Sequence, residues 1–442
     1  MSARIRTTVA TAALTAATLT LAACAGGEPE GDPGGETVIT CATCQESPTD
    51  PFLQYNFEAA TRFNEEYAGQ YRIEMLNNAN AGSSEDRLQY YQRLALADDL
   101  PDLFQLNSAE IAALSETGTL HDFTTELDAE PDWADSFQTG AFDALTGAEG
   151  QVWAIPQQRD PIGTYWNTEA WGSVGFETFP TTWDDFEVGA EALAQQGKLA
   201  LALDGDWATM LTWTNLIGTQ PGGVDFLKGE IGEGGDWSGN PAVVAATERL
   251  RGWHTAGYVN SDAFSGEFSN AAAAYLSTDA AAVPNGPWFV ATNLQTDAAA
   301  PGLYDSTGYA LSPGWDAGQG VIVVSGAGWV SGATDEASLE AVGAFMRFVT
   351  TAEEALTQAA ETGANPAVVV PGAELASADL EPLSAGLVIA AAEAEFTYPH
   401  VRVFGPAGFG PAWKNLWPAY VNGEMDTSTF LSRLSADATA GA

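Results

Sequence analysis

The chain has 442 residues, 45% of them hydrophobic, which is enough for two ordinary domains with separate cores. It carries 59 Asp and Glu residues against 15 Lys and Arg residues, a formal net charge of −44 at pH 7. This field repels polyanions, so nucleic acid and anionic lipid surfaces are excluded as binding partners. A salt-rich habitat and the general genome composition are both open explanations of the acidity.

The N-terminal segment has the pattern of a bacterial export signal. Arg4 and Arg6 precede a mildly apolar run, residues 8–21, that is too short for a membrane helix. The run ends in Leu-Ala-Ala-Cys, which resembles a lipobox. The resemblance implies that residues 1–24 are a lipoprotein signal and that Cys24 is acylated, with palmitate as an acyl chain. An ordinary signal peptide that contains a cysteine is the alternative.

A short acidic region follows the signal. Residues 25–36 are rich in Gly, Pro and Glu and cannot bury enough apolar surface to fold, so they are predicted to form a flexible tether. The first strand is predicted at residues 37–40.

Two cysteines come directly after this strand. Because the chain is predicted to be exported, a disulfide between Cys41 and Cys44 is favoured over a zinc site, which would need two further soft ligands. A redox-active Cys-x-x-Cys pair is the alternative, although the rest of the chain lacks a thioredoxin-type pattern.

The segment 87–123 is predicted to contain a helix, a short strand at 102–106 and a second helix. Asn107 and Ser108 are predicted to cap the second helix. Ligands in α/β proteins bind where strands end, so Asn107, Ser108 and Glu110 are candidate ligand-binding residues. An ordinary strand and helix of the core is the alternative.

A second strand end carries similar residues. The apolar run 199–203 is typical of a buried parallel strand and leads to Asp204, Asp206 and Trp207. The remaining ligands of a calcium loop are absent, so no metal is predicted here. Asp206 and Trp207 are therefore candidate ligand-binding residues.

Several motifs occur in the order found in the family-one extracellular solute-binding proteins of bacterial ABC importers, and the chain resembles this family over residues 37–434. The match is best with members that bind maltose or oligosaccharides. The motifs are PDLF at 101–104, GTL at 118–120, IGTYWN at 162–167, PTTWDD at 180–185, NGPW at 285–288, GAGW at 326–329, GANP at 363–366 and PAW at 411–413.

The resemblance implies an α/β fold of the periplasmic-binding-protein type, with two lobes, three crossings between them and a ligand cleft that closes by hinge motion. Lobe one would comprise residues 36–157 and 315–365. Lobe two would comprise residues 158–314 and 366–442.

The resemblance also implies sugar-binding tryptophans. Trp288 occupies the position at which relatives stack an indole on a sugar ring, and Trp413 a position near the start of the closing helices. Trp329 and Trp207 are further candidates at strand ends. An indole face suits a pyranose, whose axial C–H groups are slightly positive. Packing of a turn is the alternative role for Trp288.

The function implied is that of a lipid-anchored protein on the extracellular face of the cell membrane. It would capture a di- or oligosaccharide and deliver it to the permease subunits of an ABC importer, as a monomer and without a cofactor or metal. The alternatives are a binding protein for a non-sugar solute and a secreted carbohydrate hydrolase with paired carboxylates. The three histidines are scattered, and no H-E-x-x-H, G-x-S-x-G or P-loop pattern occurs.

Overall fold

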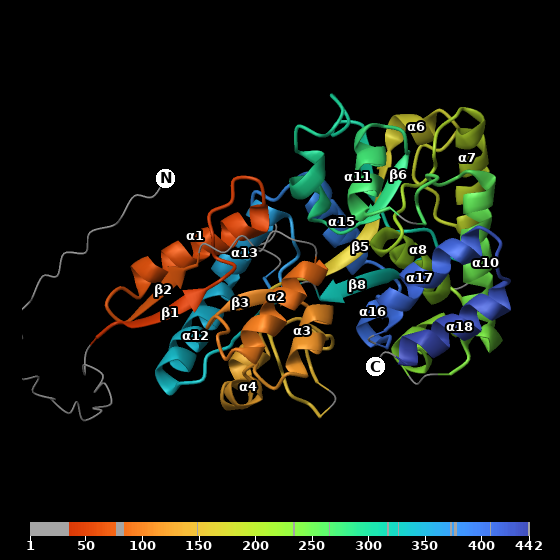
Figure 1. Cartoon of the computed structure of the whole chain (residues 1–442). Helices are drawn as coiled ribbons and strands as arrows, with labels where there is room; N and C mark the ends of the chain where they lie inside the picture. Colours follow the sequence, from red (N-terminus) through yellow and green to blue (C-terminus); the bar gives the residue numbers. More distant parts are fainter. Residues whose placement is uncertain are drawn as a thin grey trace, which may run out of the picture. The chain divides into compact units, whose positions relative to one another are not determined.

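The structure is a computed structural model that describes residues 35–76, 84–147, 149–232, 235–264, 266–315, 318–325, 327–371, 374, 378–406 and 408–440. The predicted signal with Cys24, and the predicted tether up to residue 34, lie outside the described residues. The chain from Glu36 onward forms one compact unit, in which the strands fall into two groups (Figure 1).

The first group of strands, with its helices, is called lobe one. β1 (Thr37–Cys41) pairs in parallel with β2 (Tyr71–Met75). β9 (Ala327–Val330) pairs antiparallel with β3 (Phe104–Asn107) and β4 (Ile155–Pro156). A bridge between Cys41 and Leu103 joins the two sets of strands. The C-terminal end of β1 therefore lies beside the residues that lead into β3.

Helices of lobe one pack on these strands, and α1, α12 and α13 contact one another. Asp50 begins α1 by accepting hydrogen bonds from the amides of Phe52 and Leu53. The helices are α1 (Pro51–Glu66), α2 (Ser84–Leu96), α3 (Ser108–Ser115), α4 (Thr124–Ala129), α5 (Pro131–Ala134), α12 (Glu336–Val349) and α13 (Ala352–Thr362).

The second group of strands, with its helices, is called lobe two. β5 (Arg159–Asn167) is central and pairs antiparallel with β6 (Ala282–Asn285), β7 (Thr307–Ala310) and β8 (Val321–Ser325). β10 (Thr397–Pro399) pairs in parallel with β8. The run 199–203, predicted as a strand, is buried except for the partly buried Leu199, and it forms bridges from Leu199 and Leu201 without a regular strand.

Many helices surround this sheet, and α8 contacts β6 and β8 while α15 contacts β5 and β7. The helices are α6 (Thr168–Gly172), α7 (Trp183–Gln195), α8 (Trp207–Gly218), α9 (Gly223–Asp225), α10 (Pro241–Ala256), α11 (Phe268–Leu276), α15 (Pro382–Ala392), α16 (Val401–Phe404), α17 (Phe409–Val421) and α18 (Thr427–Ala440), with short turns of other helix types at Phe226–Glu230, Trp237–Gly239 and Val290–Leu294. Within the described ranges, no helix has the length and apolar character needed to cross a membrane.

Among the described residues, the chain passes between the lobes at three places, and two of them differ from the prediction. Residues 315–325 were predicted in lobe one. The structure instead pairs β8 with β5 and β10, so the chain returns to lobe one only between β8 and β9. The apolar run of β8 suits a buried strand in either sheet, so its composition could not identify the sheet.

Residues from 366 onward were predicted in lobe two, but Ala367 and Val368 are part of the core of lobe one and Val368 bridges Phe137. The third crossing is therefore the whole connection from Gly363, after α13, to the start of α15.

The first and third crossings are joined by hydrogen bonds. The backbone amide of Asn365 donates to Asp160 Oδ1 (2.7 Å), and its side-chain amide donates to the carbonyl of Arg159 (2.6 Å). Asp160 is fully buried, and this burial raises the pKa of its carboxyl group to about 8. The crossings thus contain a carboxyl group that favours its neutral form.

Candidate ligand-binding site

Two of the predicted sugar-binding tryptophans are core residues. Trp413 on α17 is fully buried and stacks on Trp417, with ring centroids 4.6 Å apart and an interplanar angle of 14°. Trp329 on β9 is also fully buried and meets Phe345 edge to face. Their indole faces are covered by other side chains, so in this structure neither Trp413 nor Trp329 can stack on a sugar.

Trp288 differs, because its side chain is only partly buried. Its indole lies directly over Gly286, where a Cβ atom would clash with the ring. The carbonyl of Pro287 accepts a hydrogen bond from Ser384 Oγ (2.7 Å), which fixes the turn. This carbonyl also lies close to Gly363, the left-handed residue that ends α13 of lobe one (φ 74°). Trp288 therefore follows a turn that lies beside the third crossing.

The start of α8 carries the second partly buried tryptophan, Trp207. Asp206 is the N-cap residue of α8, but its own side chain makes no capping hydrogen bond. Asp204 Oδ1 takes that role, because it accepts hydrogen bonds from the amides of Asp206 and Ala208, each at 2.9 Å. Burial of Asp204 raises the pKa of its carboxyl group to about 6. The ring of Trp207 lies 4.9 Å from that of His400.

Asp206 is paired with two cations that were not among the predicted ligand-binding residues. Its carboxylate contacts the guanidinium of Arg402 and lies 2.9 Å from Lys414 Nζ. Lys414 is more than half exposed, whereas burial lowers the pKa of the Arg402 guanidinium. The cations come from α16 and α17, about 200 residues after Asp206, so no local pattern could have predicted this cluster.

In lobe one, Asn107 and Glu110 form a capping box at the start of α3. Asn107 Oδ1 accepts from the amide of Glu110 (3.0 Å), and Glu110 Oε2 accepts from the amide of Asn107 (2.9 Å). Glu110 is buried, and both of its oxygens also accept hydrogen bonds from Arg87. The predicted ligand role of Glu110 therefore does not fit this structure, because its carboxylate is already fully engaged.

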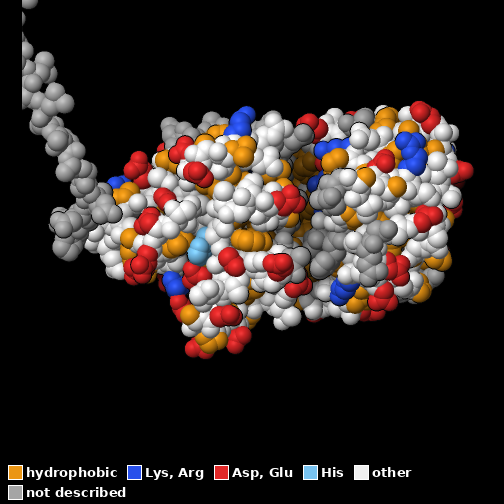
Figure 2. All heavy atoms as spheres, turned by 60° about the horizontal axis from the view of Figure 1, so that its bottom comes forward, with side chains coloured by type: hydrophobic (Ala, Val, Ile, Leu, Met, Phe, Trp, Pro, Cys, Tyr) orange, Lys and Arg blue, Asp and Glu red, His pale blue; other side chains and the backbone are white. Residues whose placement is uncertain are grey.

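The two sets of residues are brought together by a contact between α16 and α3. Asn107 and Ser108, both partly buried, start α3, and Arg402 lies on α16. Figure 2 shows a face of the molecule that is hollowed between its two halves, with Lys and Arg side chains beside the hollow. The candidate site comprises Asn107 and Ser108 from lobe one and Asp206, Trp207, Arg402 and Lys414 from lobe two. Trp288, beside the third crossing, is a further candidate.

Three amide side chains that sequence reasoning missed lie close to the first crossing. Gln105 is on β3, two residues before Asn107, and hydrogen bonds connect it to Asn56 and Gln157. A glutamine within the apolar segment 102–106 was the available signal.

The disulfide between Cys41 and Cys44 that we predicted is present, and both cysteines are buried.

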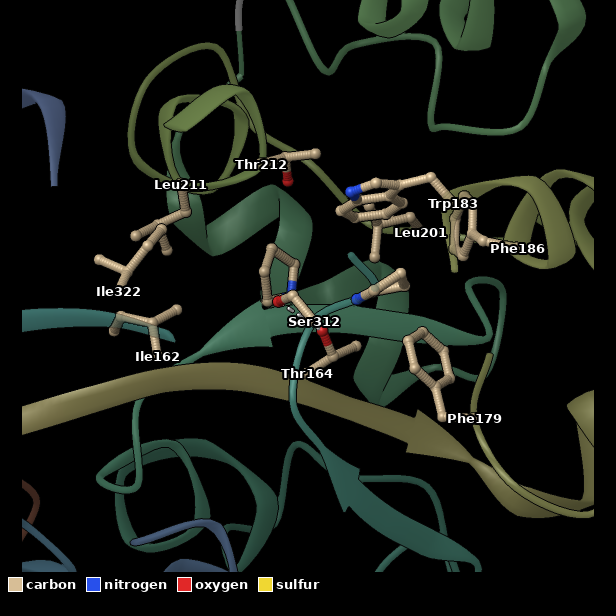
Figure 3. A pocket seen from close by; sticks show the side chains of 12 residues that line it. Ile162, Thr164, Phe179, Trp183, Phe186, Leu201, Leu211, Thr212, Ser312 and Ile322 are labelled. Atoms are coloured by element: carbon tan, nitrogen blue, oxygen red, sulfur yellow. Dashed lines mark hydrogen bonds between the residues drawn. The ribbon is translucent and has the colours of Figure 1, made fainter. Parts of the chain in front are cut away.

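A small cavity lies within the core of lobe two, and none of the candidate site residues lines it (Figure 3). It has room for about one water molecule. Apolar side chains line most of it, including Ile162, Leu211 and Ile322, while Thr164 and Ser312 supply hydroxyl groups 3.2 Å apart. It is too small for a sugar. Among the described residues, no three His, Cys, Asp or Glu side chains are grouped as a metal site would require.

Comparison with known proteins identifies the family. A search of curated protein sequences found no match. Solved structures with similar folds include a chitin oligosaccharide binding protein (19% identity, TM-score 0.74, covering 92% of this chain and 98% of that one). The GacH receptor of Streptomyces glaucescens, solved unliganded and with acarbose, is 19% identical (TM-score 0.70, coverage 91% and 97%). Maltose-bound MalE3 of T. maritima is 17% identical (TM-score 0.68, coverage 92% and 100%). Residues 46–356 match the sequence profile of one family, and the chain therefore belongs to the bacterial extracellular solute-binding proteins.

Proposed function

We propose that the protein binds a di- or oligosaccharide between its lobes and delivers it to the permease subunits of an ABC importer. The main supporting observation is the pair of partly buried tryptophans, Trp207 and Trp288, which lie in lobe two with polar side chains close to Trp207. Aromatic faces bind the apolar faces of sugar rings, while fixed polar groups bind the hydroxyls. The structural relatives named above bind chitin oligosaccharide, acarbose and maltose, which agrees with this ligand class.

The charges near Trp207 suit a ligand without net charge. Two cations, Arg402 and Lys414, lie beside the carboxylate of Asp206 and the buried carboxyl group of Asp204. The pKa of Asp204, about 6, leaves this group mostly ionised at pH 7, so the two positive charges face two negative ones. Hydrogen bonds to charged groups are stronger than neutral ones, so paired charges of this kind can hold hydroxyls firmly. The proposed ligand is accordingly a neutral sugar.

The proposal includes a lipid anchor at Cys24 that holds the protein on the extracellular face of the membrane. A chain with so strong a negative charge has little affinity for anionic lipid, so acyl chains would supply the attachment. We propose that the protein acts as a monomer, because one chain supplies both sides of the candidate site.

Hydrolysis of a sugar is the competing function. It would need a protonated acid near an ionised carboxylate, and Asp204 with Asp206 offers such a pair. Asp204, however, is only 1% exposed and its Oδ1 accepts backbone amides, so the geometry favours binding over catalysis.

One screen tests these functions together. Maltose, N,N′-diacetylchitobiose and xylobiose are titrated into the protein in a calorimeter, with amino acids as non-sugar solutes, and each mixture is then assayed for reducing ends. We expect saturable binding of at least one disaccharide without release of reducing ends. Binding of an amino acid alone would contradict the sugar proposal, and a steady release of reducing ends would establish a hydrolase.

A further inference from the structure

The three amide side chains beside the first crossing form a closed ring of hydrogen bonds. Asn56 Nδ2 donates to Gln105 Oε1 (2.6 Å), Gln105 Nε2 donates to Gln157 Oε1 (2.5 Å), and Gln157 Nε2 donates to Asn56 Oδ1 (3.2 Å). We call these three residues the amide ring. Each amide both donates and accepts within it, so the orientation of every member is fixed by the other two.

Thr43 holds the amide ring from the β1 side. Its carbonyl accepts a hydrogen bond from Asn56 Nδ2 (3.1 Å), and its hydroxyl accepts one from the backbone amide of Gln105 (3.1 Å). Thr43 lies inside the short loop that is closed by the disulfide between Cys41 and Cys44. The disulfide therefore restricts the residue to which two members of the ring are attached.

Gln157 links the ring to the crossings. Its backbone amide donates to the carbonyl of Ala327, at the start of β9 (3.1 Å). Its carbonyl accepts a hydrogen bond from the amide of Ala367, within the third crossing (3.2 Å). Gln157 itself ends the first crossing on the side of lobe one, so this residue touches all three connections between the lobes.

Gln105 is the member of the ring that can reach a ligand. Asn56 and Gln157 are buried, whereas Gln105 is partly exposed. Gln105 and Asn107 are two residues apart on β3, so their side chains point to the same face of the sheet. Among the described hydrogen bonds, Gln105 Nε2 donates one of its two N–H groups to the ring, which leaves the second for a ligand.

We propose that Gln105 donates a hydrogen bond to a hydroxyl of the sugar. The side-chain amide of Gln105 is held in the binding orientation by two positioning residues, Asn56 and Gln157, and by the Cys41–Cys44 disulfide. This inference rests on the proposed function. A buried amide network satisfies its own hydrogen bonds without net charge, which suits a ligand that presents both donors and acceptors. The disulfide thus acts on binding through Gln105 and contributes more than stability of the fold.

A double-mutant cycle tests this coupling. Gln105→Leu, the disulfide-free variant Cys41→Ser/Cys44→Ser and their combination are titrated with maltose, N,N′-diacetylchitobiose and xylobiose. Gln105→Leu should weaken binding about tenfold, which corresponds to about 1.4 kcal/mol. The disulfide-free variant should lose affinity as well. The combined variant should bind no more weakly than Gln105→Leu alone, because the disulfide acts through the residue already removed.

Two further variants separate positioning from folding. Thr43→Val keeps the disulfide but removes the hydroxyl that accepts a hydrogen bond from the backbone amide of Gln105, so this variant should also weaken binding. If circular dichroism shows that the disulfide-free variant does not fold, Thr43→Val takes its place in the cycle. Gln89→Leu, at an exposed position on α2, should bind as the unchanged protein does. Wild-type affinity in Gln105→Leu, or losses that simply add, would overturn the inference while the proposed function stands. If the unchanged protein binds none of the disaccharides, both are overturned.

Discussion

Replacement of Trp288 by alanine separates a ligand contact from a core residue. The indole is partly exposed and packs over Gly286, beside a turn that Ser384 fixes independently. Loss of a central aromatic contact costs about 2 kcal/mol of binding free energy, or about thirtyfold in affinity. Because the side chain is only partly buried, we expect a smaller loss of about 1–2 kcal/mol in the free energy of unfolding.

Trp413→Ala is the matched comparison, because it removes the same side chain from a fully buried position between Trp417 and Phe409. Truncation of a buried tryptophan costs about 3–5 kcal/mol of the free energy of unfolding. Affinity for the sugar, measured at a temperature where this variant is still folded, should change little.

Both quantities are measured on both variants, by denaturant unfolding and by calorimetric titration with the disaccharide that binds. The reasoning is refuted if Trp288→Ala unfolds as readily as Trp413→Ala but keeps its affinity. It is equally refuted if Trp413→Ala loses binding without losing stability, because the buried tryptophan would then reach the ligand in solution.

Three other predictions concern charge and anchoring. The unfolded chain loses the Asp160 proton near the ordinary pKa of 3.8 and the folded chain only near 8, so the free energy of unfolding should fall as pH rises through this window, by at most about 1.4 kcal/mol per pH unit. Asp160→Asn should lack this pH-dependent fall in the free energy of unfolding. The test is urea unfolding of both proteins at pH 5 and pH 8, and an equal change in the free energy of unfolding in the two proteins would disprove the prediction. Glu110→Gln should lower the free energy of unfolding by about 1–3 kcal/mol, because Arg87 loses its ion pair. If this variant instead loses sugar affinity and keeps its stability, Glu110 is a ligand-binding residue after all. Cys24→Ala should move the protein from the membrane fraction to the medium, and retention in the membrane would count against acylation.

Local patterns predicted the helix starts well. The Thr-Trp-Asp-Asp run within the motif at 180–185 is typical of a capped helix start, and Thr182 does accept from the amide of Asp185 at the start of α7. Asn107 likewise caps α3 as expected. Such caps involve residues three positions apart, so the sequence contains all the information they need.

The candidate site was harder to predict because its contacts join distant segments. Trp413 and Trp417 are one helical turn apart and therefore share a face, but the sequence does not tell whether that face meets the cleft or the core. Asp206 meets Lys414 only when lobe two has folded, and Asn56 meets Gln157 only when lobe one has folded. These pairings depend on the packing of whole helices and strands, which residue spacing does not encode.

The most direct test of the account is a crystal structure of the protein grown with the disaccharide that binds in the screen. We predict sugar density between α3 and the segment that contains Asp206 and Trp207, with a pyranose ring against the indole of Trp207 or Trp288 and a hydroxyl within hydrogen-bond distance of Gln105. Density for the sugar at any other place, with both indoles uncovered, would contradict the account.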